Sequence, residues 1–308
     1  MIFAMRMRER IISICMGLAV LALFFGTAGA AGAEPSIMVQ PRRVVQGGIL
    51  ALEVSDLKEN ARVTASFDGV ETPLTYDGRA DAYVGLLGVD LEKEPEESVV
   101  RIDIDGAEVT DIPVIVASKD YGERRLTLPP SMTEFDEETL ARIRREQKLV
   151  ASLWGGSDPQ RLWSEAFLRP APGVETGPFG RRTFVNDEPR SRHSGVDLRA
   201  EKNENILCSN TGRVVLAKDL FFSGKSVFID HGQGLFTMYF HLNDILVDEG
   251  AMVTRGQVIG KAGSTGRSTG AHLHWGVRLN RARVDPAALL EISDRLGLKA
   301  FNQEQEGQ

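Results

Sequence analysis

Short runs of alternating apolar and polar residues dominate the sequence between residues 37 and 117. Such alternation is typical of β-strands that bury one face, and the Asp-Gly pairs at residues 68–69 and 105–106 are typical of hairpin turns. About six or seven strands in a segment of this length favour a small antiparallel β-sandwich. The clearest predicted strands are Ile49–Val54, Arg62–Phe67, Ala82–Leu87, Val99–Ile104 and Ile112–Val116.

Residues 119–172 show a different pattern, which we interpret as a linker that contains one helix. A polar stretch ends in Pro129-Pro130, and a helical pattern then runs from Glu137 to Leu153. An acidic first turn and the pair Gly155-Gly156 mark its two ends. Its apolar residues form only a narrow stripe, and so we expect a connecting helix that packs on one or both neighbouring domains.

Residues 173–292 return to short strands separated by glycines, and they predict a second domain built on an antiparallel β-sheet. Helical periodicity appears only near residues 285–296, and residues 293–308 are expected to form a tail. The predicted fold is therefore all-β, with an N-terminal β-sandwich at residues 34–118, the linker helix and the C-terminal sheet. The clearest strands of the second domain are Thr211–Ala217, Ser226–Asp230, Leu235–Leu242, Val258–Lys261 and Ala271–Leu279.

Residues 1–33 have the layout of a secretory signal peptide. Three arginines precede an apolar run at residues 11–25, and small residues follow, with cleavage expected after Ala30 or Ala33. An uncleaved membrane anchor is the alternative, because the apolar run approaches spanning length. We expect an exported protein of the periplasm or cell envelope, with no stable membrane insertion once the signal is removed.

The charge of the chain argues against nucleic acid as a partner. The formal net charge is −7, and loss of the three arginines and one glutamate of residues 1–33 would make it −9. Nucleic-acid binding depends on lysine and arginine side chains that neutralise phosphates. Cys208 is the only cysteine after residue 33, and so we expect no internal disulfide. Its apolar neighbours favour a buried, unreactive thiol.

All five histidines lie between residues 178 and 284. The pair His272 and His274 would project from one face of a strand, about 6.6 Å apart along the chain. The opposite face carries Leu273 and Trp275, which are suited to a core. Two histidines aligned on the polar face therefore predict a functional site rather than a pair of core residues.

A second candidate segment contains His193 and Asp197, four residues apart. On a straight strand their Cα atoms would be roughly 13 Å apart, and a bend near Ser194-Gly195 would bring them together. The two segments together offer imidazoles and one carboxylate. Two imidazoles and one carboxylate with an open fourth position are what a catalytic zinc site requires, and Zn²⁺ is therefore the expected cofactor.

Further motifs around these residues occur in the order found in a known family. The sequence resembles the M23 family of zinc metallopeptidases, the lysostaphin/LytM-type peptidoglycan endopeptidases. Besides the two histidine segments, the motifs that carry the resemblance are Gly177-Pro178-Phe179-Gly180, His231-Gly232-x-Gly234, Tyr239-Phe240-His241-Leu242, Gly256-Gln257-x-Ile259-Gly260 and Gly266-x2-Ser268-Thr269-Gly270.

The resemblance implies that His193, Asp197 and His274 ligate zinc and that His241 and His272 assist catalysis. It also implies an antiparallel sheet that lines a groove, in which peptide bonds of peptidoglycan stem peptides or cross-bridges are hydrolysed. Peptidoglycan peptides are thus the expected partner, while the sequence makes no prediction of the oligomeric state or of which bond is cut. A further hypothesis is that the sandwich or the linker helix covers the groove and limits access.

The implied chemistry agrees with the general behaviour of zinc sites. Zn²⁺ held by two neutral imidazoles and one carboxylate keeps positive charge, which lowers the pKa of a bound water to about 7. The sequence contains no HExxH motif that would supply a glutamate base, and so an imidazole must take or relay the proton. His241 and His272 are both candidates, whereas His231 lies in a glycine turn and is expected to be structural.

Two non-enzymatic interpretations compete with this one. Some M23 members have lost metal ligands and act as activators of other wall hydrolases, but this sequence keeps every position. The spacing Val247-x2-Gly250-x2-Val253 resembles the hairpin of biotinyl or lipoyl carriers, yet a carrier has no use for five histidines. The alternative that we retain is a non-catalytic, wall-binding activator of another hydrolase.

Overall fold

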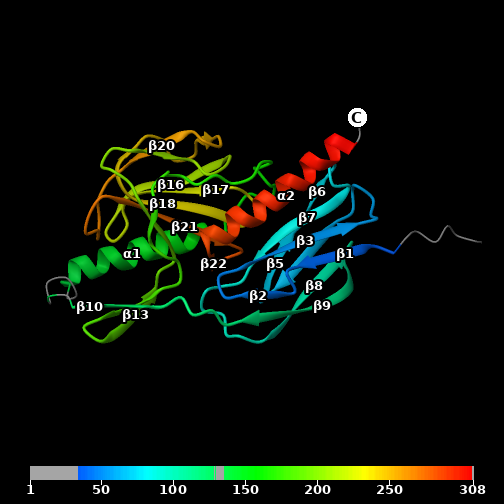
Figure 1. Ribbon diagram of the computed structural model, residues 1–308, viewed down its shortest axis with the longest axis horizontal. Helices are drawn as coiled ribbons and strands as arrows, with labels where there is room; N and C mark the ends of the chain where they lie inside the picture. The colour runs from blue at the N-terminus through cyan, green and yellow to red at the C-terminus, as the bar shows by residue number, and fades with distance from the viewer. Residues whose placement is uncertain (1–33, 128, 130–134, 307–308) are drawn as a thin grey trace, which may run out of the picture. The chain divides into compact units, whose positions relative to one another are not determined.

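The computed structural model describes residues 34–127, 129 and 135–306, and β-strands make up most of its regular structure (Figure 1). The prediction of a mostly β fold is thereby confirmed. The predicted signal peptide, residues 1–33, lies outside the described residues. Of the helices that are described, none is long and apolar enough to cross a membrane.

Two sheets between residues 36 and 117 face each other across one hydrophobic core. Their strand orders are β1-β3-β7-β6 and β2-β9-β8-β4-β5. Neighbouring strands are antiparallel, as predicted, except that β2 runs parallel to β9. The strands are β1 (Ser36–Gln40), β2 (Arg43–Val45), β3 (Ile49–Ser55), β4 (Val63–Phe67), β5 (Val70–Pro73), β6 (Thr75–Asp77), β7 (Ala82–Gly88), β8 (Glu97–Ile104) and β9 (Ala107–Ala117).

Strands β3 and β7 bury both of their faces, which explains their nearly continuous apolar sequences. Leu50 and Leu52 of β3 belong to the core of the sandwich, whereas Ile49 and Ala51 belong to a second core. This second core also contains residues of the C-terminal sheet and of helix α2 (Pro286–Glu306). The described residues from Pro35 onwards accordingly form one compact unit.

Most C-terminal strands form a ten-stranded sheet with the order β11-β14-β21-β18-β17-β16-β19 along its main path. β20 pairs with β15 and β18, β22 pairs with β21, and a separate small sheet has the order β10-β12-β13. The strands are β10 (Glu123–Leu126), β11 (Glu175–Gly177), β12 (Arg182–Val185), β13 (Glu188–Arg192), β14 (Gly195–Arg199), β15 (Asn205–Leu207), β16 (Gly212–Leu220), β17 (Gly224–Asp230), β18 (Leu235–Ile245), β19 (Met252–Val253), β20 (Val258–Ala262), β21 (His272–Leu279) and β22 (Ala282–Val284).

Helix α1 (Glu137–Leu153) has the predicted bounds and packs on one face of the ten-stranded sheet. The Asp136 carboxylate caps its first turn by accepting a hydrogen bond from the Thr139 N–H at 2.7 Å. Near its C-terminal end, Val150 and Trp154 pack against sheet residues of which Phe228 is one. The predicted connecting helix is therefore a covering element of the sheet.

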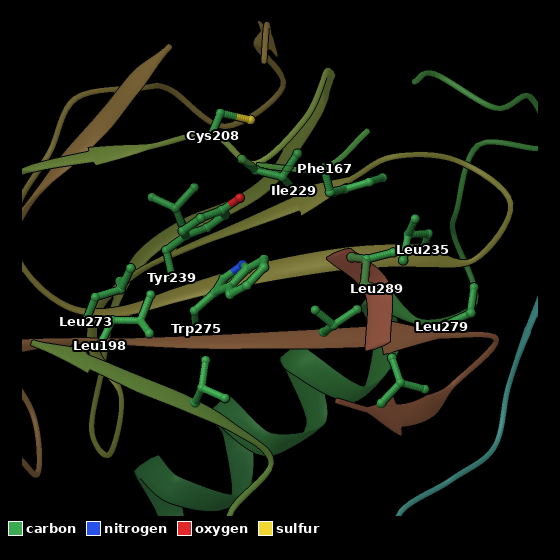
Figure 2. Packing of buried hydrophobic residues seen from close by; sticks show 14 of the residues in the cluster. Phe167, Leu198, Cys208, Ile229, Leu235, Tyr239, Leu273, Trp275, Leu279 and Leu289 are labelled. Atoms are coloured by element: carbon green, nitrogen blue, oxygen red, sulfur yellow. The ribbon is translucent and has the colours of Figure 1, made fainter. Parts of the chain in front are cut away.

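The opposite face of the same sheet carries the larger core, part of which is shown in Figure 2. Tyr239 and Trp275 are buried there on adjacent strands, and Leu289 of α2 packs in the same cluster. Helix α2 is longer than the segment 285–296 that sequence periodicity indicated, and it continues through residues expected to form a tail. Helix α1 thus packs on one face of the sheet, and the larger core lies on the other face.

A polar contact joins the sandwich to the C-terminal region at Asp90 and Arg283. The Arg283 guanidinium donates hydrogen bonds of 2.5 and 3.1 Å to the Asp90 carboxylate, and the Arg283 backbone N–H donates a third of 2.8 Å. Burial opposes the ionisation of Asp90, but these donors outweigh it, and the pKa of Asp90 is lowered. The two side chains are 26% and 24% exposed, so the pair is partly shielded from water.

We expect Asp90→Ala to lower the free energy of unfolding by about 2 kcal/mol at pH 7, because it removes the carboxylate that accepts the hydrogen bonds of a partly buried guanidinium. The difference from wild type should shrink as the pH falls through the lowered pKa of Asp90, since the pair stabilises the fold only while the carboxylate is ionised. Urea unfolding measures both effects. Glu291→Gln is the matched control, because its pair with Arg295 is more than half exposed and such pairs contribute little. Equal losses in the two variants would contradict the prediction.

Candidate metal centre

Strands β14 and β21 bring Asp197 and His274 together. The strands are antiparallel neighbours, and their register places Asp197 directly opposite His274. Directly opposite residues project from the same face of a sheet, and here His274 Nδ1 lies 2.9 Å from Asp197 Oδ1. The register of one strand pair therefore creates the first two members of the site.

His193 lies between β13, which ends at Arg192, and β14, which begins at Gly195. The regular strand geometry is interrupted at residues 193–194, where a bend was expected. The interruption allows His193 Nε2 to approach Asp197 Oδ1 to 3.1 Å and His274 Nδ1 to 3.0 Å. The other ring nitrogen, Nδ1, lies 2.9 Å from the carbonyl oxygen of Pro178, where it can donate its hydrogen. A neutral His193 ring then presents its lone pair at Nε2.

These three side chains have the chemistry and spacing of a metal site. Two imidazole nitrogens and one carboxylate oxygen lie 2.9 to 3.1 Å from one another. Zinc binds such atoms at about 2.0–2.2 Å, so all three can reach one ion. Within the part of the chain that the structure describes, this is the only group of three or more His, Cys, Asp or Glu side chains that converges in this way.

The charge state of the group also suits a cation. Burial opposes the ionisation of Asp197, but hydrogen bonds from His193 and His274 outweigh it and hold the pKa of Asp197 far below its usual range. Burial lowers the pKa of His274 despite the nearby carboxylate. At His193 burial acts in the same direction, but the hydrogen bond with Asp197 outweighs it and the pKa is raised. An ionised carboxylate between imidazoles is the donor set that a divalent metal requires.

Two glycines make room for the group. A Cβ atom on Gly177, which pairs with Asp197 across β11 and β14, would lie 2.2 Å from Asp197 Oδ2. A Cβ atom on Gly195 would lie 2.7 Å from His274 Nε2 and 2.4 Å from the Trp275 carbonyl oxygen. A side chain at position 177 would displace the Asp197 carboxylate, and one at position 195 would displace the His274 ring or the backbone of β21.

His241 and His272 lie beside this group, with their ring centroids 4.8 Å apart. Each ring has a backbone carbonyl oxygen 2.8 Å from its Nδ1 atom, that of Thr265 for His241 and that of Gly270 for His272. Donation of hydrogen to these carbonyls leaves Nε2 of each neutral ring unprotonated. His272 Nε2 is 3.7 Å from Asp197 Oδ1, at the edge of the candidate metal group.

The backbone of His241 explains how its ring reaches the site. In a regular strand His241 would share the core face with Tyr239, two residues earlier. Its φ angle is instead 62°, in the left-handed region that residues with a side chain rarely adopt, and its N–H donates to the Ser223 carbonyl oxygen at 2.8 Å. The break in alternation turns the ring towards His272. Burial lowers the pKa of His241 to about 4, although the Thr265 carbonyl opposes this shift.

Comparisons with known proteins agree with this geometry. The family model described as Peptidase family M23 matches residues 191–286. A crystal structure from Pseudomonas aeruginosa assigned to peptidase M23 is similar over 80% of this chain and 94% of its own, with a TM-score of 0.64 and 30% sequence identity. This chain belongs to peptidase family M23.

Curated relatives match this chain over shorter stretches than the Pseudomonas aeruginosa structure does. The peptidoglycan DD-endopeptidase ShyA of Vibrio cholerae is 42% identical over 83 residues, which are 27% of this chain and 19% of ShyA. The DD-carboxypeptidase/endopeptidase Mpg of Neisseria meningitidis is 36% identical over 114 residues, which are 37% of this chain and 26% of Mpg. The M23 chain thus spans about a fifth to a quarter of the length of these relatives.

His231 and Cys208 are buried and do not belong to the candidate metal group. His231 is fully buried, and its two ring nitrogens lie 2.8 Å from the Thr211 carbonyl oxygen and 2.8 Å from Thr237 Oγ1. This agrees with the structural role expected from the sequence. Cys208 is also fully buried, as expected, and burial raises the pKa of its thiol to about 12.

The sequence does not reveal the groups that orient the imidazoles of the M23 site. Pro178, Thr265 and Gly270 act through backbone carbonyl oxygens, which any residue type supplies. Phe240, whose ring is stacked on His274, follows the alternation of its strand like any other apolar residue. The only available signal is that Pro178, Phe240 and Gly270 lie within motifs that carry the family resemblance.

We expect Gly177→Ala to weaken zinc binding by about tenfold or more, because the added methyl group displaces the Asp197 carboxylate and disturbed support of a metal ligand has effects of this size. Competition with a chromophoric chelator measures the affinity. Gly78→Ala is the control, because a Cβ atom there meets nothing closer than 3.8 Å. Unchanged zinc binding in Gly177→Ala would show that Asp197 is not held as described.

His231 should make the metal-free protein less stable in mild acid. Burial lowers its pKa from 6.5 to about 4, so below pH 6.5 the unfolded chain takes up a proton that the folded protein does not. We expect a contribution of about 2 kcal/mol to be lost between pH 7 and pH 5. Urea unfolding of wild type and His231→Gln at both pH values measures it. The variant should show the smaller dependence, and equal dependence in both proteins would contradict this account.

Proposed function

We propose that this chain is a zinc-dependent endopeptidase that hydrolyses peptide bonds in peptidoglycan stem peptides or cross-bridges. One observation carries the proposal. His193, Asp197 and His274 converge from separate segments within 2.9 to 3.1 Å of one another, and two further imidazoles lie beside them. A structural metal site would be closed by four protein ligands, whereas three ligands with neighbouring bases are typical of a hydrolytic site.

The proposed roles divide the five residues into two sets. His193, Asp197 and His274 would hold the ion through Nε2, Oδ1 and Nδ1. When bound, zinc supplies a Lewis acid that polarises a scissile carbonyl and lowers the pKa of water. The Pro178 carbonyl keeps His193 in the tautomer that binds through Nε2.

His241 and His272 would move the proton. Each is fixed by a carbonyl at Nδ1, so its Nε2 can accept a proton from the attacking water and return it to the nitrogen of the leaving amine. The lowered pKa of His241 keeps it neutral at neutral pH, which is the form needed in a base. The two ring centroids are 4.8 Å apart, which supports a shared role in proton transfer.

The choice of peptidoglycan as substrate rests on relatives. The aligned part of ShyA belongs to a protein named as a peptidoglycan DD-endopeptidase, and a site in the cell envelope is consistent with the signal peptide expected at residues 1–33. The complete set of five residues supports the enzyme over a non-catalytic activator, because an activator has no need of a metal group or of oriented bases.

Variants that separate metal binding from proton transfer test the proposal. His274→Ala should lose bound zinc and all hydrolysis of cross-linked muropeptides, whereas His241→Ala should keep its zinc and lose about 100-fold or more in kcat. Metal content is measured by mass spectrometry of the purified full chain, and products are identified by the same method.

Lys218→Gln is the matched control, because Lys218 is an exposed residue of β16, a strand that contributes none of the five proposed site residues. It should behave as wild type. Hydrolysis by His274→Ala would refute the ligand assignment, and a zinc-loaded wild type that binds but never cleaves peptidoglycan would favour the activator instead.

A further inference from the structure

His274 differs from the other imidazoles of the site in the way its ring is held. His193, His241 and His272 each have a backbone carbonyl oxygen within 2.9 Å of Nδ1. For His274 the polar contacts involve Nδ1 alone, and within the described residues no hydrogen-bonding partner faces its Nε2. Metal-binding histidines usually donate the second ring N–H to an acceptor that fixes the ring. Something else must therefore set the orientation of His274.

Phe240 occupies the position from which a side chain can do this. The register of β18 and β21 places Phe240 directly opposite His274, and their rings are stacked with centroids 5.3 Å apart and planes inclined by only 4°. On the other side, Gly195 leaves space for the ring edge that carries Nε2. Rotation of the imidazole about its Cβ–Cγ bond would break this stack and move Nδ1 away from Asp197.

Helix α1 packs behind Phe240. The Phe228 ring lies 5.3 Å from the Phe240 ring, and the Trp154 ring at the end of α1 lies 6.2 Å from Phe228. The helix is held over this face by a second contact, in which the Glu146 carboxylate accepts a hydrogen bond of 2.7 Å from the Phe221 N–H. A continuous row of aromatic rings thus leads from α1 to a candidate metal ligand.

We propose that Phe240 is a positioning residue for His274 and that helix α1 keeps Phe240 in place through Trp154 and Phe228. The inference rests on the proposed function only in taking His274 as a metal ligand. It makes α1 a part of the metal site rather than only a connection between the sandwich and the sheet. Loss of the aromatic contact should weaken metal binding, whereas a helix that merely limits access to substrate would leave metal affinity unchanged.

Zinc affinity of Phe240 variants is the decisive measurement. Phe240→Leu keeps an apolar residue but removes the flat ring, and we expect the zinc Kd, from chelator competition, to rise by about tenfold or more. Phe240→Tyr keeps the ring and should bind zinc as wild type does. The visible absorption of the Co²⁺-loaded protein should change in Phe240→Leu and not in Phe240→Tyr, because it reports the geometry of the ligands.

Phe236→Leu is the matched control. Phe236 is a buried ring on the same strand that contacts Trp154 at 5.2 Å, but it is not stacked on His274. This variant should lose stability and keep its zinc affinity. Trp154→Leu should weaken zinc binding in the same direction as Phe240→Leu, and the double variant should be no weaker than Phe240→Leu alone, because both act through one contact. If Phe240→Leu does not fold, the zinc affinity of Trp154→Leu tests the inference instead.

The outcomes separate this inference from the proposed function. Unchanged zinc affinity in both Phe240→Leu and Trp154→Leu overturns the inference. If His274→Ala still loses its zinc in that case, the assignment of His274 as a metal ligand stands. An equal loss in Phe236→Leu and Phe240→Leu also overturns the inference, because general loosening of the sheet would then explain both. Full zinc binding by His274→Ala would instead remove the ligand assignment on which the inference rests.

Discussion

The site depends on the register between β14 and β21. Asp197 and His274 meet because they are directly opposite residues of one antiparallel pair. A shift of the pairing by one residue would move either side chain to the other face of the sheet. That register is fixed on the opposite face, where Leu273 and Trp275 are 0% and 1% exposed in the core. The same strand thus uses alternate residues for stability and for chemistry, and burial of one set holds the other set in place.

The chemistry of the site requires departures from regular structure on either side of this pair. His193 lies in the break between β13 and β14, and His241 has a left-handed backbone that reverses the alternation of β18. Backbone strain of this kind persists only where surrounding contacts impose it. Here the N–H of His241 is bound to Ser223 and its ring to the Thr265 carbonyl, so both the backbone and the side chain are held.

Local pattern was sufficient to predict the longer strands and the bounds of α1, because alternation, caps and glycine turns are properties of neighbouring residues. The pair of histidines on β21 could be assigned to one face for the same reason. The parallel pairing of β2 with β9 depends on contacts between distant segments, which local pattern does not contain. His241 shows the limit most clearly. Strict alternation assigns it to the core face with Tyr239, and only the left-handed φ angle brings it to the site.

The sandwich contacts the site through Phe179, which follows the residue whose carbonyl binds His193. Phe179 is 2% exposed and makes an edge contact with Tyr121, whose ring centroid is 5.6 Å away. A Cβ atom on Gly47 of the sandwich would lie 2.4 Å from the Phe179 ring, so the two are in close contact. Gly177 and Pro178, which face Asp197 and His193, are therefore anchored at their C-terminal side by the sandwich. Helix α1 packs against Phe240. The sandwich and α1, which both precede the family match at residues 191–286, thus each contact residues next to the candidate ligands. Such contacts indicate that these segments support the geometry of the site, a role that the hypothesis of limited access does not require.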